Sequence, residues 1–334
     1  MNAPTPPPAW YPDPSRAPGL RYWDGQQWTG YTHDTASAQP APNKRTRWIA
    51  VGIAVVAAIG LFAAVIINMY RTEATSPQIV LPFTGLYNPW AVAVDTTGTV
   101  YVADYFTSQV LKLAAGSSTQ TVLPFTGLVN PEGVAVDTAG TVYIADHGNN
   151  RVVKLAAGSS SQTVLPFTAL SAPQGVAVDS AGNVYVTQSG SPRVVELDAG
   201  SSTPKDLPNG PNDPGCVAID RTGNLYVVEQ GSYQNLRFHN SVQKADSYGW
   251  TKVPLGGVTG PLCVAADTAG NLYVINGNEA PPDVVKLASG SNTQTVLPFG
   301  SLTGAQGLAV DTAGNVYVAD GGNRRVLKLP AGSR

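Results

Sequence analysis

The sequence has little charge, little cysteine and little histidine, and each scarcity excludes a class of protein. Charged residues make up 13% of the 334 residues and the formal net charge is -2, so no nucleic-acid-binding surface is expected. Two cysteines are too few for a disulfide framework, and their separation of 47 residues matches no zinc signature. The chain beyond residue 78 has only His147 and His239, which disfavours a metal-dependent catalytic centre. We therefore expect no metal or other cofactor.

One long hydrophobic run is present. Trp48–Ile67 contains no charged residue, and a helix of this length, rising about 1.5 Å per residue, spans the ~30 Å hydrocarbon core of a membrane. A signal peptide fits less well, because its apolar region is usually about 7–15 residues long and lies nearer the N-terminus. Three basic residues precede the run and one follows it, which predicts a cytoplasmic N-terminus and an extracytoplasmic remainder. We expect a single-pass cell-membrane protein with a transmembrane helix over 48–69 and a tether over 70–77.

The segment before this run has two proline-rich stretches, residues 1–8, expected to be disordered, and residues 35–47, a linker with a basic flank. Residues 9–34 between them are expected to form a small cytoplasmic domain. Asp24-Gly25 can form a tight turn between two paired strands, because glycine tolerates positive φ. The aromatic cluster predicted around this turn consists of Trp10, Tyr11, Tyr22, Trp23 and Trp28.

The pattern W-Y-P-D-P…R-Y-W-D-G-x-x-W, over residues 9–32, resembles a short domain of unknown function common in actinobacterial membrane proteins. That family brings no assigned activity. The aromatic residues are either the core of a mini-domain or a surface for a cytoplasmic partner, and the sequence leaves both open.

Beyond residue 78 the sequence repeats one unit six times, typified by G-V-A-V-D-T-A-G-T-V-Y-I-A-D-H-G-N-N-R-V-V-K-L. The aspartates that close the first strand of each unit are spaced 41 to 47 residues apart: Asp95, Asp137, Asp179, Asp220, Asp267 and Asp311. A repeat of this length predicts a β-propeller. The second unit contains four predicted strands, enough for one blade: Gly133–Asp137, Thr141–Asp146, Arg151–Leu155 and Thr163–Phe167.

The two ends of the repeat region complement each other. The last unit stops after its third strand, Arg325–Leu329, while an additional strand, Gln78–Phe83, precedes the first unit. If this strand pairs with the last blade, residues 78–334 form an all-β propeller of six complete blades, and the ring has no unpaired edge. The fourth unit departs from the pattern, because Gln234–His239 replaces N-R-V-V-K-L and an insertion follows around Asn240–Gly249.

The repeats resemble NHL-type propeller units, and in particular the extracellular sensor propeller of actinobacterial receptor-type serine/threonine kinases. The G-V-A-V-D-x-x-G-x-V-Y-V-A-D…N-R-V-x-K-L pattern and the phrases L-P-F-T-G-L and K-L-A-A-G-S carry this resemblance. No glycine-rich nucleotide loop, H-R-D or D-F-G motif is present, so no kinase accompanies the propeller. The resemblance implies a sensor or binding domain without its catalytic partner.

Strand order places the loops between fourth and first strands on the same face as those between second and third strands. The residues there vary from unit to unit, whereas the turns on the opposite face hardly change, and variation leaves room for recognition. Exposed aromatic side chains among amides suit a protein, peptide or glycan ligand. The candidate ligand-binding residues are Trp90, Tyr105, Phe106, Glu132, His147, Asn149, Gln174, Gln188, Gln306 and Arg324.

Cys216 and Cys263 replace the same glycine in adjacent units, at the start of the innermost strand. They are either a disulfide, if their Cα atoms approach within about 7 Å, or two buried thiols.

The favoured function is an extracytoplasmic binding or sensor protein, not an enzyme. A non-catalytic envelope scaffold is an alternative, and a propeller-type lyase or lactonase is a further one. The repeated aspartates favour the non-enzymatic readings, because ending a strand and starting a turn explains all six.

Overall fold

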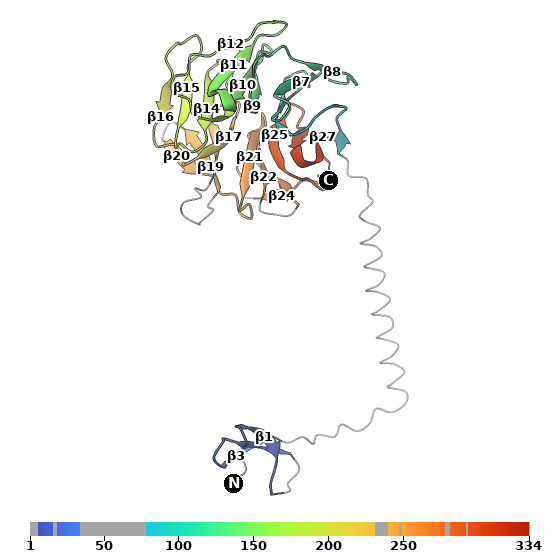
Figure 1. Ribbon diagram of the computed structural model, residues 1–334, viewed down its shortest axis with the longest axis vertical. Helices are drawn as coiled ribbons and strands as arrows, with labels where there is room; N and C mark the ends of the chain where they lie inside the picture. The colour runs from blue at the N-terminus through green and yellow to red at the C-terminus, as the bar shows by residue number, and fades with distance from the viewer. Residues whose placement is uncertain are drawn as a thin grey trace. The chain divides into compact units, whose positions relative to one another are not determined.

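The computed structural model describes residues 6–15, 19–33, 78–230, 240–246, 249–277, 281–291 and 293–333 (Figure 1). The chain divides into two compact units, Met1–Ala74 and Thr75–Arg334. Regular structure in the described ranges is almost entirely β, with two short 3-10 helices, η1 (His147–Asn149) and η3 (Gly321–Asn323). No helix within these ranges is long and apolar enough to cross a membrane. The helix predicted over 48–69 lies outside them.

The first unit contains a three-stranded antiparallel sheet of β1 (Ala9–Pro12), β2 (Leu20–Trp23) and β3 (Trp28–His33). The predicted turn joins β2 to β3: Gly25 has a φ of 97°, and the Asp24 carboxylate accepts backbone hydrogen bonds from Gln26 and Gln27. The strand after the turn, β3, begins at Trp28, because these hydrogen bonds hold both glutamines in the turn.

The aromatic side chains of this sheet form two clusters rather than the single one predicted. Trp10 and Tyr22 pack edge to face, 5.3 Å apart. Trp28 packs against Tyr11 at 6.1 Å and Trp23 at 5.2 Å between ring centres. Neighbouring residues of a strand point to opposite faces, so Trp10 and Tyr11 cannot share a cluster.

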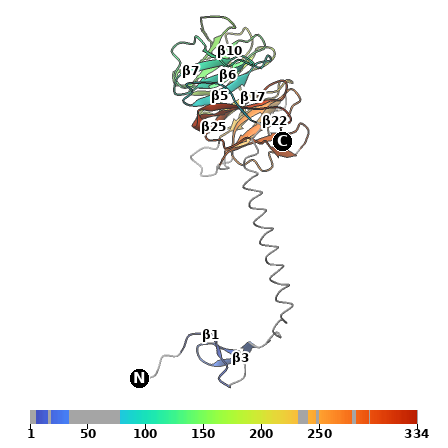
Figure 2. The same ribbon diagram turned by 90° about the vertical axis from the view of Figure 1, so that its right-hand side faces the viewer.

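The second unit contains, within the described residues, six four-stranded antiparallel sheets (Figures 1 and 2). The first three, each written from its inner strand outward, are β5 (Pro89–Val94), β6 (Val100–Asp104), β7 (Gln109–Leu113), β8 (Gln120–Val122); β9 (Pro131–Val136), β10 (Val142–Asp146), β11 (Arg151–Leu155), β12 (Thr163–Val164); and β13 (Pro173–Val178), β14 (Val184–Gln188), β15 (Val194–Leu197), β16 (Lys205–Leu207). The other three are β17 (Pro214–Ile219), β18 (Leu225–Glu229), β19 (Ser241–Asp246), β20 (Gly249–Lys252); β21 (Pro261–Ala266), β22 (Leu272–Asn276), β23 (Asp283–Leu287), β24 (Gln294–Val296); and β25 (Ala305–Val310), β26 (Val316–Asp320), β27 (Arg325–Leu329), β4 (Ile79–Val80).

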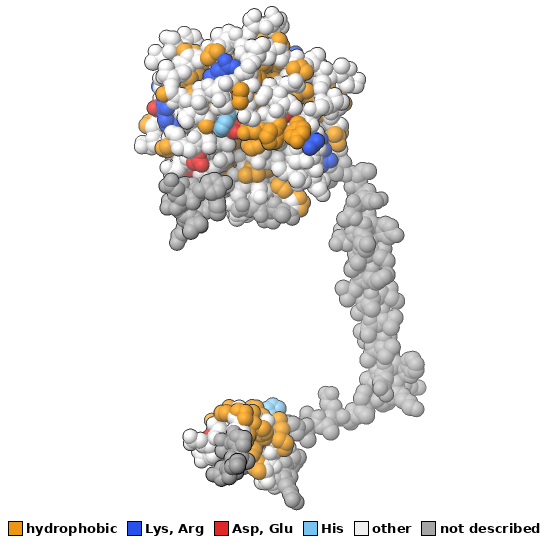
Figure 3. Space-filling model, in the orientation of Figure 1, with side chains coloured by type: hydrophobic (Ala, Val, Ile, Leu, Met, Phe, Trp, Pro, Cys, Tyr) orange, Lys and Arg blue, Asp and Glu red, His pale blue; other side chains and the backbone are white. Residues whose placement is uncertain are grey.

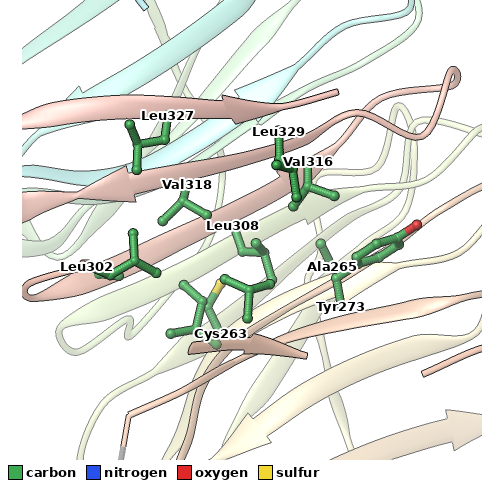
Figure 4. Close-up of a cluster of buried hydrophobic side chains, with 12 residues drawn as sticks. Cys263, Ala265, Tyr273, Leu302, Leu308, Val316, Val318, Leu327 and Leu329 are labelled. Atoms are coloured by element: carbon green, nitrogen blue, oxygen red, sulfur yellow. The ribbon is translucent and has the colours of Figure 1, made fainter. Parts of the chain in front are cut away.

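The sheets are arranged as a β-propeller. Each inner strand contacts the inner strands of the sheets before and after it, and β25 contacts β5. Apolar side chains from the faces of adjacent sheets form the core between them. In Figure 4, Cys263 and Tyr273 of one sheet lie in the same cluster as Leu308, Val318 and Leu327 of the next. Burial of such side chains is the main favourable term that holds the sheets together.

The predicted closing strand is present. β4 pairs with β27 in the last sheet, with Val80 opposite Leu327. The Leu81 amide donates to the Val326 carbonyl at 2.9 Å, and the Gln78 side chain accepts from the Gly300 amide at 2.9 Å. Gln120 makes the equivalent contact with Thr84 in the first sheet. The N-terminal strand therefore occupies the place that a fourth strand takes in the other sheets.

The fourth sheet corrects the sequence prediction. Its third strand is β19, which lies in the segment expected to be an insertion, while 231–239 lie outside the described residues. Lys244 of β19 lies opposite Tyr226, as Lys112 lies opposite Tyr101 in the first sheet. The sequence of β19, S-V-Q-K-A-D, has the same side-chain alternation as R-V-V-K-L in the second unit. The residues that depart from the repeat pattern therefore come before this strand in the sequence, not after it.

The six repeated aspartates stabilise the turn after each inner strand. The Asp311 carboxylate accepts hydrogen bonds from the amides of Ala313 and Asn315, the Asn315 side chain and the Tyr317 hydroxyl. Burial alone would raise the pKa of Asp311, but these hydrogen bonds outweigh it and the pKa lies below its ordinary value. Burial and the partner Asp137 likewise raise the pKa of Tyr143 to about 12. The repeated aspartates and their tyrosine partners therefore stabilise the turns of the propeller.

The pairing of β4 with the last sheet predicts that two substitutions of Leu81 will differ in their effect on stability. Leu81→Ala removes apolar contacts, whereas Leu81→Pro also removes the amide that bonds to Val326. We expect Leu81→Pro to lower the free energy of unfolding by about 1–3 kcal/mol more than Leu81→Ala, since a sheet carbonyl is left unpaired. Urea unfolding of both variants measures this. Equal losses would show that the backbone bond of the closing strand contributes nothing.

Candidate binding face of the propeller

One face of the propeller is assembled by buried polar side chains at the ends of the second strands. Asp146 is fully buried and accepts from the Val129 amide at 2.8 Å, which ties the preceding loop to the end of β10. Asp320 bonds to the Thr303 amide in the same way. These bonds bring the loops before each first strand beside those after each second strand, as predicted. We call this surface the loop face.

The inner strands leave a small depression at the centre of the loop face, with a cavity volume of about 70 Å³. Four predicted residues line it together: Trp90, Glu132, Gln174 and Gln306. Below them the strands approach closely. A Cβ on Gly133 would lie 2.8 Å from the Gln174 carbonyl oxygen, so only glycine fits there. We call this depression the mouth.

Glu132 lies against His147 at this mouth. Its Oε1 is 3.2 Å from Nδ1 of His147, and the Glu132 side chain is only 7% exposed. Burial raises the pKa of Glu132 to about 7, opposed by a hydrogen bond from Gln174. Burial also lowers the pKa of His147, opposed by a hydrogen bond with the backbone of Pro173. Both shifts favour the uncharged forms, and with a pKa of about 7 the Glu132 carboxyl is present in both its protonated and its ionised form at neutral pH.

Two buried oxygen atoms at the mouth have no hydrogen-bond partner in the described part of the chain: Oε2 of Glu132 and Oε1 of Gln174. Buried polar atoms are nearly always paired, because an unpaired one costs about 1–3 kcal/mol. The amide oxygen of Gln174 is a hydrogen-bond acceptor at any pH, and Oε2 of Glu132 is one when the Glu132 carboxyl is ionised. The mouth thus presents acceptors to a ligand that carries hydroxyl or ammonium donors.

An aromatic ridge runs outward from the mouth. Trp90 packs on Tyr105, Tyr105 on Phe106, and Phe106 on Tyr87, with 5.1, 5.1 and 5.5 Å between successive ring centres. Arg324 lies over the Tyr87 ring at 4.4 Å. Phe106 is 60% exposed and Tyr87 51% exposed. Figure 3 shows a band of hydrophobic side chains on the propeller surface with cationic side chains beside it.

Tyr87 was missed by the sequence analysis, which considered only residues beside the first strand and after the second. The available signal was an aromatic residue where the second unit has Val129. Its position bridges the ridge to Arg324, which sequence reasoning placed on this face but could not pair with a partner.

Two predicted ligand residues, Gln188 and Asn149, also hold the loops of this face. Gln188 is fully buried, and its Oε1 accepts from the Ser171 amide, the place that Asp146 fills in the second sheet. The Asn149 side chain donates to the Gly127 carbonyl and to Asp146, so it fixes the loop. Both were chosen because they are polar and lie in varied loops, but the loops need polar residues to satisfy their own backbone.

Cys216 and Cys263 lie on the adjacent inner strands β17 and β21, and both line the mouth. They form a disulfide, with 5.0 Å between their Cα atoms. The inner strands are close enough for a bridge at the level where the second, third and sixth sheets have glycine. Within the described residues, no three His, Cys, Asp or Glu side chains are grouped as metal ligands.

Three segments of the propeller, residues 86–113, 128–155 and 302–329, match the NHL repeat family, so these three units are NHL repeats. Residues 8–41 match the family described as protein of unknown function DUF2510. No curated protein matches the chain.

Several solved structures share the propeller fold. A gluconolactonase from Xanthomonas campestris is 17% identical with a TM-score of 0.59, covering 76% of this chain and 89% of that one. A virginiamycin B lyase from Staphylococcus aureus is 16% identical with a TM-score of 0.54, covering 77% and 86%. A chain of a nidogen/laminin complex is 18% identical with a TM-score of 0.53, covering 63% and 79%. Identities this low establish the fold alone.

The disulfide predicts that neither cysteine reacts with an alkylating agent unless a reductant is added. Because the bridge closes a loop of 47 residues, Cys216→Ser/Cys263→Ser should lose on the order of 2–4 kcal/mol of unfolding free energy. Mass spectrometry after alkylation and urea unfolding of the double variant check both statements. Two alkylated cysteines without reductant would contradict the bridge.

Glu132 predicts a specific pH dependence of stability. Its folded pKa of about 7 lies above the ordinary 4.5, so folding favours the protonated carboxyl. That stabilisation is complete below about pH 4.5 and is lost as the pH rises through 7. Glu132→Gln should therefore gain stability relative to the native chain across this window. Thermal melts would show it, with Gln306→Asn, a substitution of a non-titrating mouth residue, as control. Parallel curves for Glu132→Gln and the native chain would refute the assignment.

Proposed function

We propose that this chain is a single-pass membrane protein whose six-bladed NHL propeller lies outside the cytoplasm and binds an envelope or external ligand through its loop face. In this proposal it recognises a ligand and does not transform it. The anchor and orientation rest on the hydrophobic run and its basic flank.

The unpaired acceptors at the mouth carry this proposal. Elsewhere on the loop face, polar groups such as Asp146 and Asp320 are satisfied by neighbouring loops. Glu132 and Gln174 each keep a buried oxygen without a partner in the described ranges. A buried acceptor without a partner costs free energy, and a ligand that supplies hydrogen-bond donors to this pair would remove that cost.

The aromatic ridge supports a ligand that is extended rather than compact. Trp90 borders both the mouth and the ridge, so a group bound at Glu132 would continue onto the rings of Tyr105 and Phe106. Aromatic rings offer large apolar area at low cost in side-chain entropy and stack on sugar or peptide surfaces. Hydroxyl-bearing glycans and amine-bearing peptides of the envelope both fit these requirements.

The loop face can be tested with the full-length chain in detergent micelles against arrays of glycans and envelope peptides. Trp90→Ala/Tyr105→Ala removes the inner half of the ridge and should weaken specific binding at least about tenfold, as expected for hot-spot aromatics. Thr138→Ala/Thr268→Ala, two exposed residues at the turns of the opposite face, is the control and should bind normally. Equal binding by both double variants would place the site elsewhere.

A further inference from the structure

The sheet of the N-terminal unit carries aromatic side chains on both of its faces. Tyr11, Trp23 and Trp28 lie on one face of this sheet, with Trp28 against both other rings. We call it the Trp23 face. Trp10 and Tyr22 lie on the opposite face.

The chain's own N-terminal prolines lie on the Trp23 face. The indole nitrogen of Trp23 donates to the Pro6 carbonyl at 3.0 Å, and the Tyr11 hydroxyl donates to the Pro7 carbonyl at 3.1 Å. A Cβ built on Gly25 would lie 3.2 Å from Cγ of Pro8, so the turn passes closely beneath the proline ring. Three consecutive prolines are thus held by two aromatic donors and one close backbone contact.

This arrangement has the chemistry of proline-rich peptide recognition. Proline restricts φ to about -65° and favours the extended polyproline II conformation. Such a segment has no internal hydrogen bonds, so its carbonyls are available to donors on an aromatic-lined surface. Its preformed shape also lowers the entropy lost on binding.

The resident segment is held weakly enough to be exchanged. Pro6, Pro7 and Pro8 are all exposed, and the two hydrogen bonds that hold them are single bonds at the surface. The face beneath them is not needed to satisfy the sheet, whose strands pair with one another. Asp13 anchors β1 to β2 independently, through Arg21 at 3.0 Å.

We propose that the Trp23 face binds proline-rich segments in the polyproline II conformation, and that Pro6–Pro8 occupies it in cis as an exchangeable competitor. A partner protein with a proline-rich segment displaces the resident prolines. The effective concentration of a closely tethered segment is in the millimolar range, so only partners of comparable or higher affinity, or partners present at high local concentration, bind.

The test uses the full-length chain in detergent micelles and a fluorescein-labelled Thr-Pro-Pro-Pro-Ala peptide, with fluorescence anisotropy as the readout. Pro6→Ser/Pro7→Ser/Pro8→Ser removes the competitor and should strengthen peptide binding at least about tenfold over the native chain. In that background Trp23→Phe removes one donor and should weaken binding about fivefold to tenfold. Trp10→Phe, the matched change on the opposite face, should leave binding unchanged.

A second measurement uses the native protein, so it does not depend on any variant folding correctly. The chain has six tryptophans, so selective 15N labelling gives six indole signals for the native protein. Excess unlabelled peptide should shift the Trp23 signal and leave the Trp10 signal in place. A peptide with alanine in place of proline should shift neither. The proposal is overturned if the native chain shows no Trp23 shift with saturating peptide, or if Trp10→Phe and Trp23→Phe weaken anisotropy equally.

Discussion

The propeller depends on the pairing of β4 with β27. Gln78 contacts Gly300 across 222 residues of chain, so the strand that closes the last sheet comes from the other end of the propeller sequence. This pairing covers the edge of the last sheet and brings β25 beside β5. Loop closure over such a distance costs entropy that apolar burial between all the sheets must offset. The loop face exists only because the ring is closed.

The closed ring divides the polar residues into those that serve the fold and those that do not. Each of the six repeated aspartates accepts hydrogen bonds from backbone amides and from a tyrosine hydroxyl, as Asp311 does from Tyr317. The second-strand carboxylates bond to the neighbouring loops. Glu132 occupies neither position. Its Oε2 atom is buried beside His147 and Gln174 and has no hydrogen-bond partner in the described residues, and this unpaired acceptor supports a role in binding.

The sheet of the N-terminal unit also leaves side chains that its own fold does not fully bury. A sheet of three strands is too small to bury all its aromatic side chains, and Trp10 remains 44% exposed while Trp28 remains 37% exposed. The alternation of the strands distributes these rings over two faces. One of them is covered in part by the chain's own prolines, and the chemistry of that contact, rather than any likeness to a characterised family, indicates the partner.

Much of the architecture could be predicted from the sequence because it is periodic. The spacing of the repeated aspartates predicted the propeller, and the third strand of the second unit was predicted with its observed bounds, Arg151–Leu155. The orphan strand before the first unit predicted the pairing of β4. These features follow from local alternation and from counting strands, which need no knowledge of distant contacts. The third strand of the fourth unit was misplaced because an irregular stretch concealed the same alternation.

The site was only partly accessible to such reasoning. Sequence position placed Trp90, Glu132, Gln174 and Gln306 on one face, but not around one mouth, and it could not separate them from Gln188 and Asn149. That separation depends on which backbone groups each side chain contacts, and those groups belong to loops 17 to 22 residues away: the Ser171 amide for Gln188 and the Gly127 carbonyl for Asn149. The sequence by itself determined the repeat, its turns and the residue types available at each loop. Tertiary structure alone decided the pairing of Cys216 with Cys263, the ridge from Trp90 to Tyr87, and the two faces of the N-terminal sheet, because contacts between separate strands and loops depend on how the sheets pack.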